Sequence, residues 1–390
     1  MFLNVQEHVK KLPGLLGNPC EVAGFGHTEV GDDPRLQDTT QEYFLRRFLT
    51  DTDRAELFGH DAPWSDEEIA AKVAKCHSQT SIRNRVIFSS GVSQSEAPGV
   101  IKEINAGTTT ELAVIAAKKC LDSAKVLPTE LDAIICGTNT GPGYPSIADR
   151  VKEGLGNSRD SHAECHDLTE ACTAGAIAVK QGWLMINSGL YNKVLVVLSE
   201  RASLLAPFDR WTHANLFGDA ASAVLLVRGL EEAFVFFDTH SMPWGDYLGL
   251  IGKAEDGSGF QHDGNNVHKF VGRIIAPAII RTFELAGIDP VDIDHFVPHQ
   301  PSGKTLDLLF KKLAGTFKFW DGNGERPDDQ CLFHNQVADT GNLSSVSTIW
   351  LISKAIQDGT IRYNDKILVS AFGSGMSCCT YAFRNVIGMT

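Results

Sequence analysis

The sequence has no apolar run of about 20 residues, the length that a membrane-spanning helix needs. Its first residues, MFLNVQEHVKKLPGLLGN, lack the continuous apolar stretch of a signal peptide. Positive charge is scarce, because 35 Lys and Arg residues face 48 Asp and Glu residues, a formal net charge of −13. These absences argue against a membrane protein and against nonspecific binding to nucleic acid or anionic membranes. We therefore expect a cytoplasmic protein.

The nine cysteines lack the spacing of a disulfide framework, and their number is odd. We expect reduced thiols, most of them in the core. Cys165 has His162 and His166 close by, but no second ligand cluster follows at a suitable spacing. The sequence therefore predicts no metal site, and we expect no cofactor.

Apolar runs of strand length alternate with helical spacing along most of the chain. CEVAGFGH, LDAIICG, KVLVVLS and LFGDAASAVLLV are predicted strands, and TELAVIAAKKCLDSA and the run from Ile147 to about Leu155 are predicted helices. This alternation predicts a largely parallel sheet that is covered on both faces. The stretch from Glu29 to His77 is charged and helix-like, without a catalytic motif.

The second half of the chain repeats the first. Aligning FELAGIDPVDIDHFVPH with CLDSAKVLPTELDAIICG at a constant offset of 162 places Pro290 on Pro128. His299 then coincides with Gly137, at the carboxyl end of the equivalent strand. Such a repeat predicts two α/β units packed about a pseudo-twofold axis.

A second correspondence concerns Cys172 and Asn342. Each precedes a glycine by 17 residues, and each glycine leads into an apolar strand (KVLVVLS and DKILVSA). We therefore expect the two residues to occupy the same position in the two halves. Ligands in open α/β sheets bind at the carboxyl ends of strands, where Cys172, His299 and Asn342 are all predicted to lie.

Cys172 lies in DLTEACTAGA, just before the helical run AIAVKQGWLMINSG. In the first turn of a helix, unpaired backbone N–H groups and the positive end of the helix dipole favour a thiolate. Taken singly, a buried cysteine, histidine or asparagine is more often an inert core or turn residue. The matched positions favour a nucleophile at Cys172, with His299 and Asn342 as its partners.

The motifs DLTEACTAGA, LFGDAASAVLL, VPHQPSGK, GNLSSVS and SAFGSGMS, in this order, resemble those of the thiolase superfamily and, within it, the ketoacyl synthase III branch. The resemblance runs from about Thr80 to the carboxyl end. It implies a duplicated half with two mixed sheets in a layered αβαβα arrangement. The halves would be residues 1–228, with an amino-terminal extension and an insertion at 29–77, and residues 229–390. It also implies a homodimer.

The resemblance assigns a role to each candidate catalytic residue. Cys172 would take an acyl group from a thioester. His299 and Asn342 would donate hydrogen bonds to the thioester oxygen of a malonyl unit while carbon dioxide leaves and an enolate forms. The backbone N–H groups of Cys172 and Ser374 would form a second oxyanion hole. A histidine with an asparagine is the pattern of decarboxylating synthases.

Two residues depart from the family pattern. Ser302 stands where the family commonly has an asparagine, so a ligand-binding contact is altered. Glu170 stands where small residues are common, and a carboxylate there would oppose ionisation of the thiol unless it points away. Glu170 could recognise substrate, act as a general base or only stabilise the start of a helix.

Several residues are candidates for substrate binding. Lys304, Lys311 and Lys312 follow His299 on one predicted helix, and similar basic positions in the family receive the phosphates of coenzyme A or an acyl carrier protein. A solvated helix face is the alternative. Arg210 is a weaker phosphate candidate. Tyr144 lies where the family places a residue that reaches across the dimer to the neighbouring acyl tunnel.

These observations predict an acyltransferase that joins an acyl group to a malonyl or beta-ketoacyl thioester by decarboxylative Claisen condensation. The insertions at 29–77 and near Phe317 to Gln330, with HQPS in place of the usual motif, favour a role in specialised fatty acid or polyketide metabolism. One alternative is condensation without decarboxylation, or acyl transfer to oxygen or nitrogen. Another is a non-catalytic partner subunit.

Overall fold

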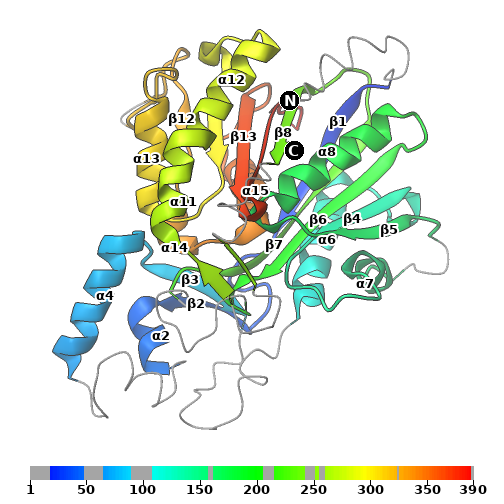
Figure 1. The fold of residues 1–390 in the computed structure, drawn as a ribbon. Coiled ribbons are helices and arrows are strands. Elements are labelled where there is room, and N and C mark those ends of the chain that lie inside the picture. The colour runs from blue at the N-terminus through cyan, green and yellow to red at the C-terminus, as the bar shows by residue number, and fades with distance from the viewer. Residues whose placement is uncertain are drawn as a thin grey trace.

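The computed structural model describes residues 18–47, 65–88, 108–156, 161–204, 215–241, 251–253, 260–322 and 325–387. Two five-stranded sheets dominate the fold (Figure 1). The first has the order β1-β7-β6-β4-β5, and its strands are β1 (Cys20–His27), β7 (Asp219–Arg228), β6 (Lys193–Arg201), β4 (Ala133–Gly137) and β5 (Glu164–Leu168).

The second sheet has the order β12-β11-β13-β14-β8. Its strands are β12 (Leu332–Phe333), β11 (His295–Pro298), β13 (Lys366–Gly373), β14 (Ser377–Arg384) and β8 (Phe234–Ser241). In each sheet the three strands at the β5 or β12 end pair in parallel, and the remaining two pairings are antiparallel. The sheets are therefore mixed, as the family resemblance implies, and the expectation of a largely parallel sheet was wrong.

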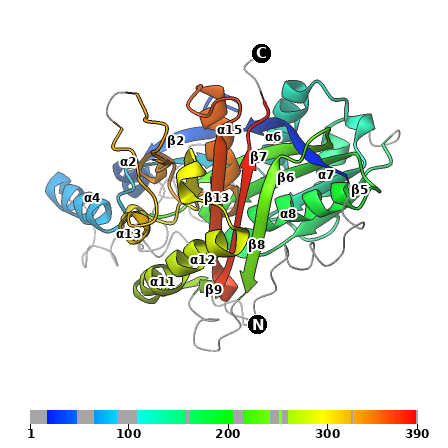
Figure 2. The same cartoon turned by 90° about the horizontal axis from the view of Figure 1, so that it is seen from above.

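Two helices separate the sheets. They are α8 (Ala174–Asn187) and α15 (Ser347–Gln357), and each contacts both sheets. Their apolar residues share one core with the inner faces of both sheets, including Val179 of α8, Ile352 of α15, Val196 of β6 and Val369 of β13. Figure 2 shows the sheets on the two sides of this central layer.

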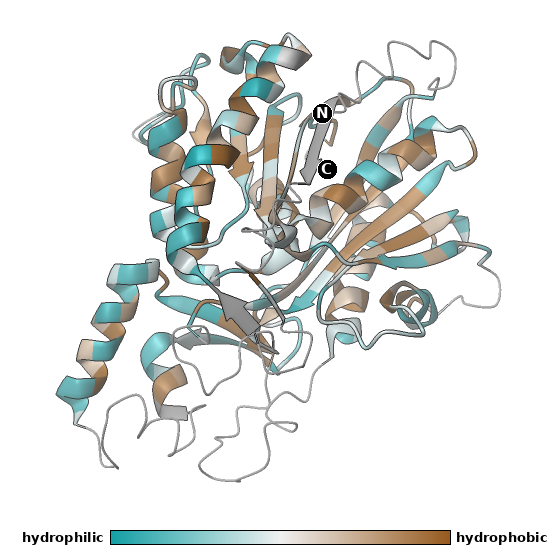
Figure 3. Cartoon of the chain, in the orientation of Figure 1, coloured by the Kyte–Doolittle hydropathy of each residue, from teal (hydrophilic) through white to brown (hydrophobic). Residues whose placement is uncertain are grey.

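The outer face of each sheet is covered by its own helices. α6 (Thr109–Ala124) and α7 (Ile147–Gly154) cover the first sheet, and α11 (Gly264–Phe270), α12 (Ala276–Ala286) and α13 (Gly303–Leu313) lie on the second. In Figure 3 the strands of both sheets are mostly brown, whereas the helices carry both brown and teal segments. The five layers are those of the expected αβαβα arrangement.

Close packing of α6 on the first sheet depends on Gly26 in β1. A Cβ atom there would lie 2.3 Å from the backbone oxygen of Ala116, so only glycine lets the helix approach. A capping box of Thr108 and Glu111 starts the same helix. Alanine and leucine at helical spacing then fill its buried face.

The predicted offset of 162 is confirmed. A 3₁₀ turn at Pro128–Glu130 precedes β4, and a 3₁₀ turn at Pro290–Asp292 precedes β11. His299 directly follows β11, at the end that corresponds to Gly137 of β4. The division between residues 228 and 229 falls between β7 and β8, and we keep it as a proposal.

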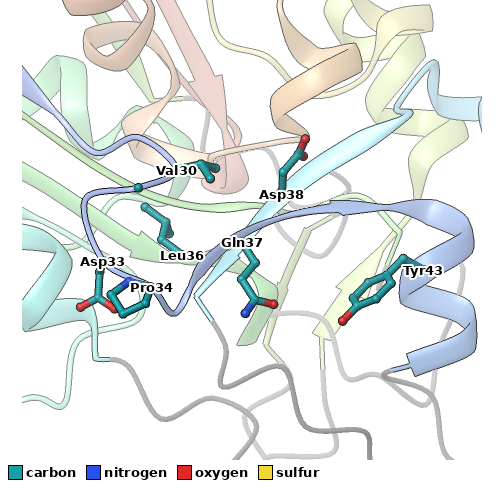
Figure 4. A pocket seen from close by; sticks show the side chains of 8 residues that line it. Val30, Asp33, Pro34, Leu36, Gln37, Asp38 and Tyr43 are labelled. Carbon is teal, nitrogen blue, oxygen red and sulfur yellow. The ribbon is translucent and has the colours of Figure 1, made fainter.

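In the described part of the stretch from Glu29 to His77, a strand precedes the helices, which the sequence did not predict. β2 (Leu36–Thr40) pairs antiparallel with β3 (Asn84–Phe88). Between these strands the chain forms α2 (Gln41–Arg47) and α4 (Asp66–Thr80), and the residues that join the two helices lie outside the described part. A surface pocket lies beside β2 and α2 (Figure 4). None of the candidate catalytic residues lines it; its lining residues are Val30, Gly31, Asp33, Pro34, Leu36, Gln37, Asp38 and Tyr43.

Among the described residues, no helix is long and apolar enough to cross a membrane. The same residues contain no cluster of three His, Cys, Asp or Glu side chains that could hold a metal ion. His162, Cys165 and His166 therefore do not form such a cluster.

Candidate active site

Cys172 lies in a short 3₁₀ turn, Ala171–Thr173, that runs directly into α8. Ala171 has a φ of 48°, a left-handed conformation that bends the chain between β5 and the helix. Its backbone oxygen accepts a hydrogen bond from Nδ2 of Asn139 at 3.1 Å. This bend places Cys172 at the amino-terminal entrance of α8, close to the predicted first turn.

The same bend occurs in the second half, and it corrects one expectation. Ser344 has a φ of 51° and begins the 3₁₀ turn Ser344–Val346 that runs into α15. Ser344 thus corresponds to Ala171, and Ser345 corresponds to Cys172. The predicted equivalence of Cys172 with Asn342 is wrong, because α15 has 11 residues and α8 has 14, which shifts any count made from the helix ends.

The end of β13 packs against the nucleophile segment. A Cβ atom at Gly373 would lie 2.9 Å from both the backbone nitrogen and the Cβ of Cys172. Only glycine fits this contact, which brings the main chain of Gly373 and Ser374 next to Cys172. The Oγ of Ser374 donates a hydrogen bond to the backbone oxygen of Ile251.

His299 is buried at the end of β11. Its backbone N–H donates to the oxygen of Ser370 at 2.8 Å, and its ring meets the ring of Phe372 edge-on at 5.4 Å. Nδ1 lies 3.3 Å from Oγ of Ser347. Burial lowers the pKa of His299 to about 3, so the imidazole is neutral at pH 7.

The proton of Ser347 determines what His299 can do. The Ser347 hydroxyl lies within hydrogen-bond distance of two acceptors, Nδ1 of His299 and the backbone oxygen of Ser344 at 2.9 Å. When Ser347 donates to Nδ1, the neutral ring carries its proton on Nε2 and can donate a hydrogen bond.

Asn342 precedes the 3₁₀ turn and does not open the helix itself. Its backbone N–H donates to the backbone oxygen of Leu216 at 2.8 Å, and its backbone oxygen accepts from the backbone N–H of Gly218 at 3.1 Å. These two bonds hold Asn342 beside the segment that leads into β7. Its side-chain Oδ1 accepts from the backbone N–H of Ser344 at 2.8 Å. The side-chain NH₂ group is therefore the end of the amide that is available to a ligand.

Ser344 connects the three candidates. Its hydroxyl lies 3.8 Å from Sγ of Cys172, its backbone N–H is bonded to Asn342, and its backbone oxygen meets Ser347, which contacts His299. The structure thus brings the three predicted segments to one place. Ser344 and Ser347 were missed as functional residues, although both lie in the motif GNLSSVS.

Glu200 is the other residue that the sequence did not reveal. It lies at the end of β6, is completely buried, and accepts hydrogen bonds from the backbone N–H of Asn139 at 3.0 Å, Oγ1 of Thr140 at 3.0 Å and Oγ of Ser345 at 2.7 Å. The predicted strand ended at Ser199, one residue too early to include it. Burial raises the pKa of Glu200, and its hydrogen bonds oppose that rise.

The environment of Cys172 disfavours a resting thiolate. Burial raises the pKa of its thiol to about 12, the hydrogen bond to Ser344 lowers it, and the charge of Glu200 raises it again. The expectation that the helix start alone favours a thiolate is therefore wrong for the resting protein. The nearby carboxylate that opposes ionisation is Glu200, while Glu170 precedes the 3₁₀ turn and is half-buried.

The candidate substrate-binding residues that the structure describes lie on or next to α13 and in the loop after β4. Lys304, Lys311 and Lys312 are exposed on α13. Ser302 caps that helix, with Oγ 3.0 Å from Oγ1 of Thr305, so its hydroxyl has a structural partner. Tyr144 is 94% exposed in the loop after β4. Arg210 lies outside the described residues.

Comparison with known proteins decides the family. The model for 3-oxoacyl-[acyl-carrier-protein (ACP)] synthase III matches residues 166–243, and the model for its C-terminal part matches 283–385. The beta-ketoacyl-[acyl-carrier-protein] synthase III of Streptococcus sanguinis is 30% identical over 351 residues, which cover 86% of this chain and 94% of that protein. The chain belongs to the synthase III family. It is therefore an acyltransferase of the ketosynthase type, which condenses acyl thioesters.

Solved structures of similar proteins share the fold. A priming beta-ketosynthase from a polyketide biosynthetic pathway has a TM-score of 0.75 at 21% identity, over 95% of this chain and 98% of that one. OleA of Xanthomonas campestris, with bound lauric acid and lauroyl-CoA, has a TM-score of 0.72 at 17% identity, over 95% and 100%. Both likenesses extend across nearly the whole synthase III chain.

Proposed function

We propose that the chain joins two acyl units by a decarboxylative Claisen condensation on Cys172. The thiol attacks the carbonyl carbon of an acyl thioester, and the leaving thiol departs. A malonyl thioester then binds and loses its carboxylate as carbon dioxide, and the resulting enolate carbon attacks the acyl group on Cys172. A beta-ketoacyl thioester has no carboxylate to lose, so it would enter this step only after deprotonation of the carbon between its two carbonyl groups. The new product leaves as a longer beta-ketoacyl thioester, and the free Cys172 thiol is regenerated.

The observation that supports decarboxylation is the pairing of two uncharged side chains, His299 and Asn342, each of which can donate a hydrogen bond. Burial keeps the imidazole neutral, and the bond from Ser344 holds Oδ1 of Asn342 so that its NH₂ group is the available end. An enolate oxygen needs donors of this kind as negative charge develops on it. The backbone N–H groups of Cys172 and Ser374 would serve the tetrahedral intermediates of acyl transfer.

The acyl carrier would bind over α13. Exposed Lys304, Lys311 and Lys312 can attract the phosphates of coenzyme A or an acidic carrier protein, in a chain that is otherwise strongly acidic. A homodimer would give the exposed Tyr144 a partner surface beside the neighbouring acyl tunnel. A cytoplasmic location and a role in specialised metabolism stay predictions.

Intact-protein mass after incubation with a panel of acyl thioesters tests the first step. We expect one acyl adduct on the wild-type chain and none on Cys172→Ala. If no thioester acylates Cys172, a non-catalytic partner subunit becomes the better interpretation.

Product mass tests the second step. Incubation with and without a malonyl thioester separates the alternatives, because the decarboxylative reaction gives product only with the malonyl unit present. A product from two acyl thioesters alone would support condensation without decarboxylation. An ester or amide product would support acyl transfer to oxygen or nitrogen.

A further inference from the structure

The buried carboxylate of Glu200 and the thiol of Cys172 share one intermediary, the hydroxyl of Ser344. Its Oγ lies 3.8 Å from Sγ of Cys172 and 3.4 Å from Oε1 of Glu200. Ser344 is held there by its left-handed backbone and by the bond from its N–H to Asn342. A hydroxyl can accept one proton while it donates another, so this placement forms a two-step path.

A resting Cys172 thiol needs a proton acceptor when it attacks. Its raised pKa keeps it protonated at neutral pH, and the lowered pKa of His299 makes that imidazole a weak base. The raised pKa of Glu200 makes its carboxylate a stronger base than an exposed one. The charge of Glu200 raises the pKa of two thiols, those of Cys172 and Cys136.

We propose that Glu200 accepts the proton of Cys172 through Ser344 when the thiol is acylated. The sulfur forms its bond to the thioester carbonyl carbon as its proton moves to Oγ of Ser344, whose own proton moves to Oε1 of Glu200. When the tetrahedral intermediate collapses, the carbon–sulfur bond to the leaving group breaks, and the proton returns along the same path to that thiolate. The balance is a thioester exchange with no net gain or loss of protons.

This role deepens the proposed function and relies on it for the acylation step. It also has a rival, because a negative charge near a thiol opposes ionisation without any transfer of protons. The two interpretations predict opposite effects of Glu200→Gln, which removes the charge and nearly keeps the shape. A proton acceptor makes this variant slower than wild type, whereas a purely electrostatic neighbour makes it faster.

Alkylation of Cys172 by iodoacetamide is the decisive measurement, because it reads deprotonation without requiring acyl transfer. Rates are followed by peptide mass from pH 6 to 10, with Cys172→Ala as background. We expect Glu200→Gln to be slower at neutral pH by roughly 100-fold, the scale of general base catalysis. A rate equal to or faster than wild type overturns the proposal.

Two serines provide a matched pair. Ser345 donates to the same oxygen of Glu200 at 2.7 Å, but it is Ser344 that bridges to the sulfur. Ser344→Ala is expected to slow alkylation as much as Glu200→Gln, and the double variant is expected to be no slower than either. Ser345→Ala removes one donor to the Glu200 carboxylate but leaves the bridge to the sulfur intact, so it is expected to slow alkylation clearly less than Ser344→Ala. Equal slowing by the two variants contradicts the path. Additive effects of Ser344→Ala and Glu200→Gln contradict the path.

If Glu200→Gln does not fold, the wild-type protein still decides. Transfer of two protons gives a curved dependence of the alkylation rate on the fraction of D₂O, and a linear dependence overturns the relay. The proposed function is tested separately, by acylation of Cys172. If alkylation of the wild-type chain shows the relay but no thioester acylates Cys172, the relay stands and the proposed synthase role of Cys172 is wrong.

Discussion

Oδ1 of Asn342 accepts a hydrogen bond from the backbone N–H of Ser344 at 2.8 Å, which fixes the direction of the amide. One end of the side chain is held by the main chain that precedes α15. The other end, the NH₂ group, takes no part in this contact and can donate to a ligand. Asn342 is therefore oriented as a donor before any ligand arrives.

Asn342→Asp is expected to keep acylation and lose condensation. The carboxylate cannot donate to an enolate oxygen, and its charge repels the one that develops there. Loss of one such donor costs about 2.7–4 kcal/mol at the transition state, or roughly 10²–10³-fold in kcat. Intact mass measures acylation of Cys172, and product formation with a malonyl thioester measures condensation. Exposed Asn192 provides the control, since Asn192→Asp should leave both steps intact.

Gly373→Ala is expected to impair acylation itself. The added methyl group would lie 2.9 Å from the backbone nitrogen and the Cβ of Cys172, so the nucleophile segment must shift. A displacement of about 1 Å at a reacting group can cost about 10²-fold in rate. Gly315→Ala is the matched control, because a Cβ at Gly315 meets no atom within 4 Å. Equal rates of Cys172 acylation in the two variants would argue against this packing.

Acid is expected to destabilise the fold through buried histidines. Burial lowers the pKa of His299 and His334 to about 3, whereas an unfolded histidine titrates near 6.5. Between these values the unfolded chain binds more protons, so each group reduces the free energy of unfolding by about 1.4 kcal/mol per pH unit as pH falls. Above about pH 6.5 their contribution is complete.

The variant His334→Gln isolates one of these groups. His334 lies 3.1 Å from Nδ1 of His295, so the substitution lowers stability at every pH, and the informative quantity is the slope. Urea unfolding between pH 4 and 8 should give a shallower decline for the variant. An unchanged slope would mean that His334 is not a neutral group that acid must charge.

Tyr144→Ala is expected to widen the range of acyl chains accepted, if a second copy of the chain covers this residue. Tyr144 is 94% exposed here, so its truncation should leave the stability of a single chain nearly unchanged. Competition between short and long acyl thioesters, read as adduct masses on Cys172, measures the effect. A chain-length profile identical to wild type would count against a role for Tyr144 in the neighbouring tunnel.

Local sequence patterns predicted the elements that carry their own signals. Pro128 and Pro290 mark equivalent turns because proline restricts the backbone in the same way in both halves. The 3₁₀ turns that these prolines begin are therefore 162 residues apart, as the sequence repeat predicted. The strand Cys20–His27 was predicted with its observed ends, since apolar residues and a glycine turn bound it.

Long-range partners could not be read in the same way. β2 has the polar sequence LQDTT and exists as a strand because β3 pairs with it from more than forty residues away. Pairing of β1 with β7 likewise depends on the folded chain, which is why the sheet was expected to be parallel. Glu200 escaped notice because a charged residue at the end of an apolar run is normally exposed, whereas hydrogen bonds keep this one in the interior.

The left-handed bends at Ala171 and Ser344 have a bearing on ancestry. If two identical halves preceded the fused chain, each had the same left-handed bend before its central helix, and the same residue followed the bend. In this chain the residue after the first bend is Cys172, and the residue after the second bend is Ser345. The two halves have thus diverged at this corner: the first carries the proposed nucleophile, Cys172, and the second carries Ser344, whose hydroxyl lies 3.8 Å from its sulfur.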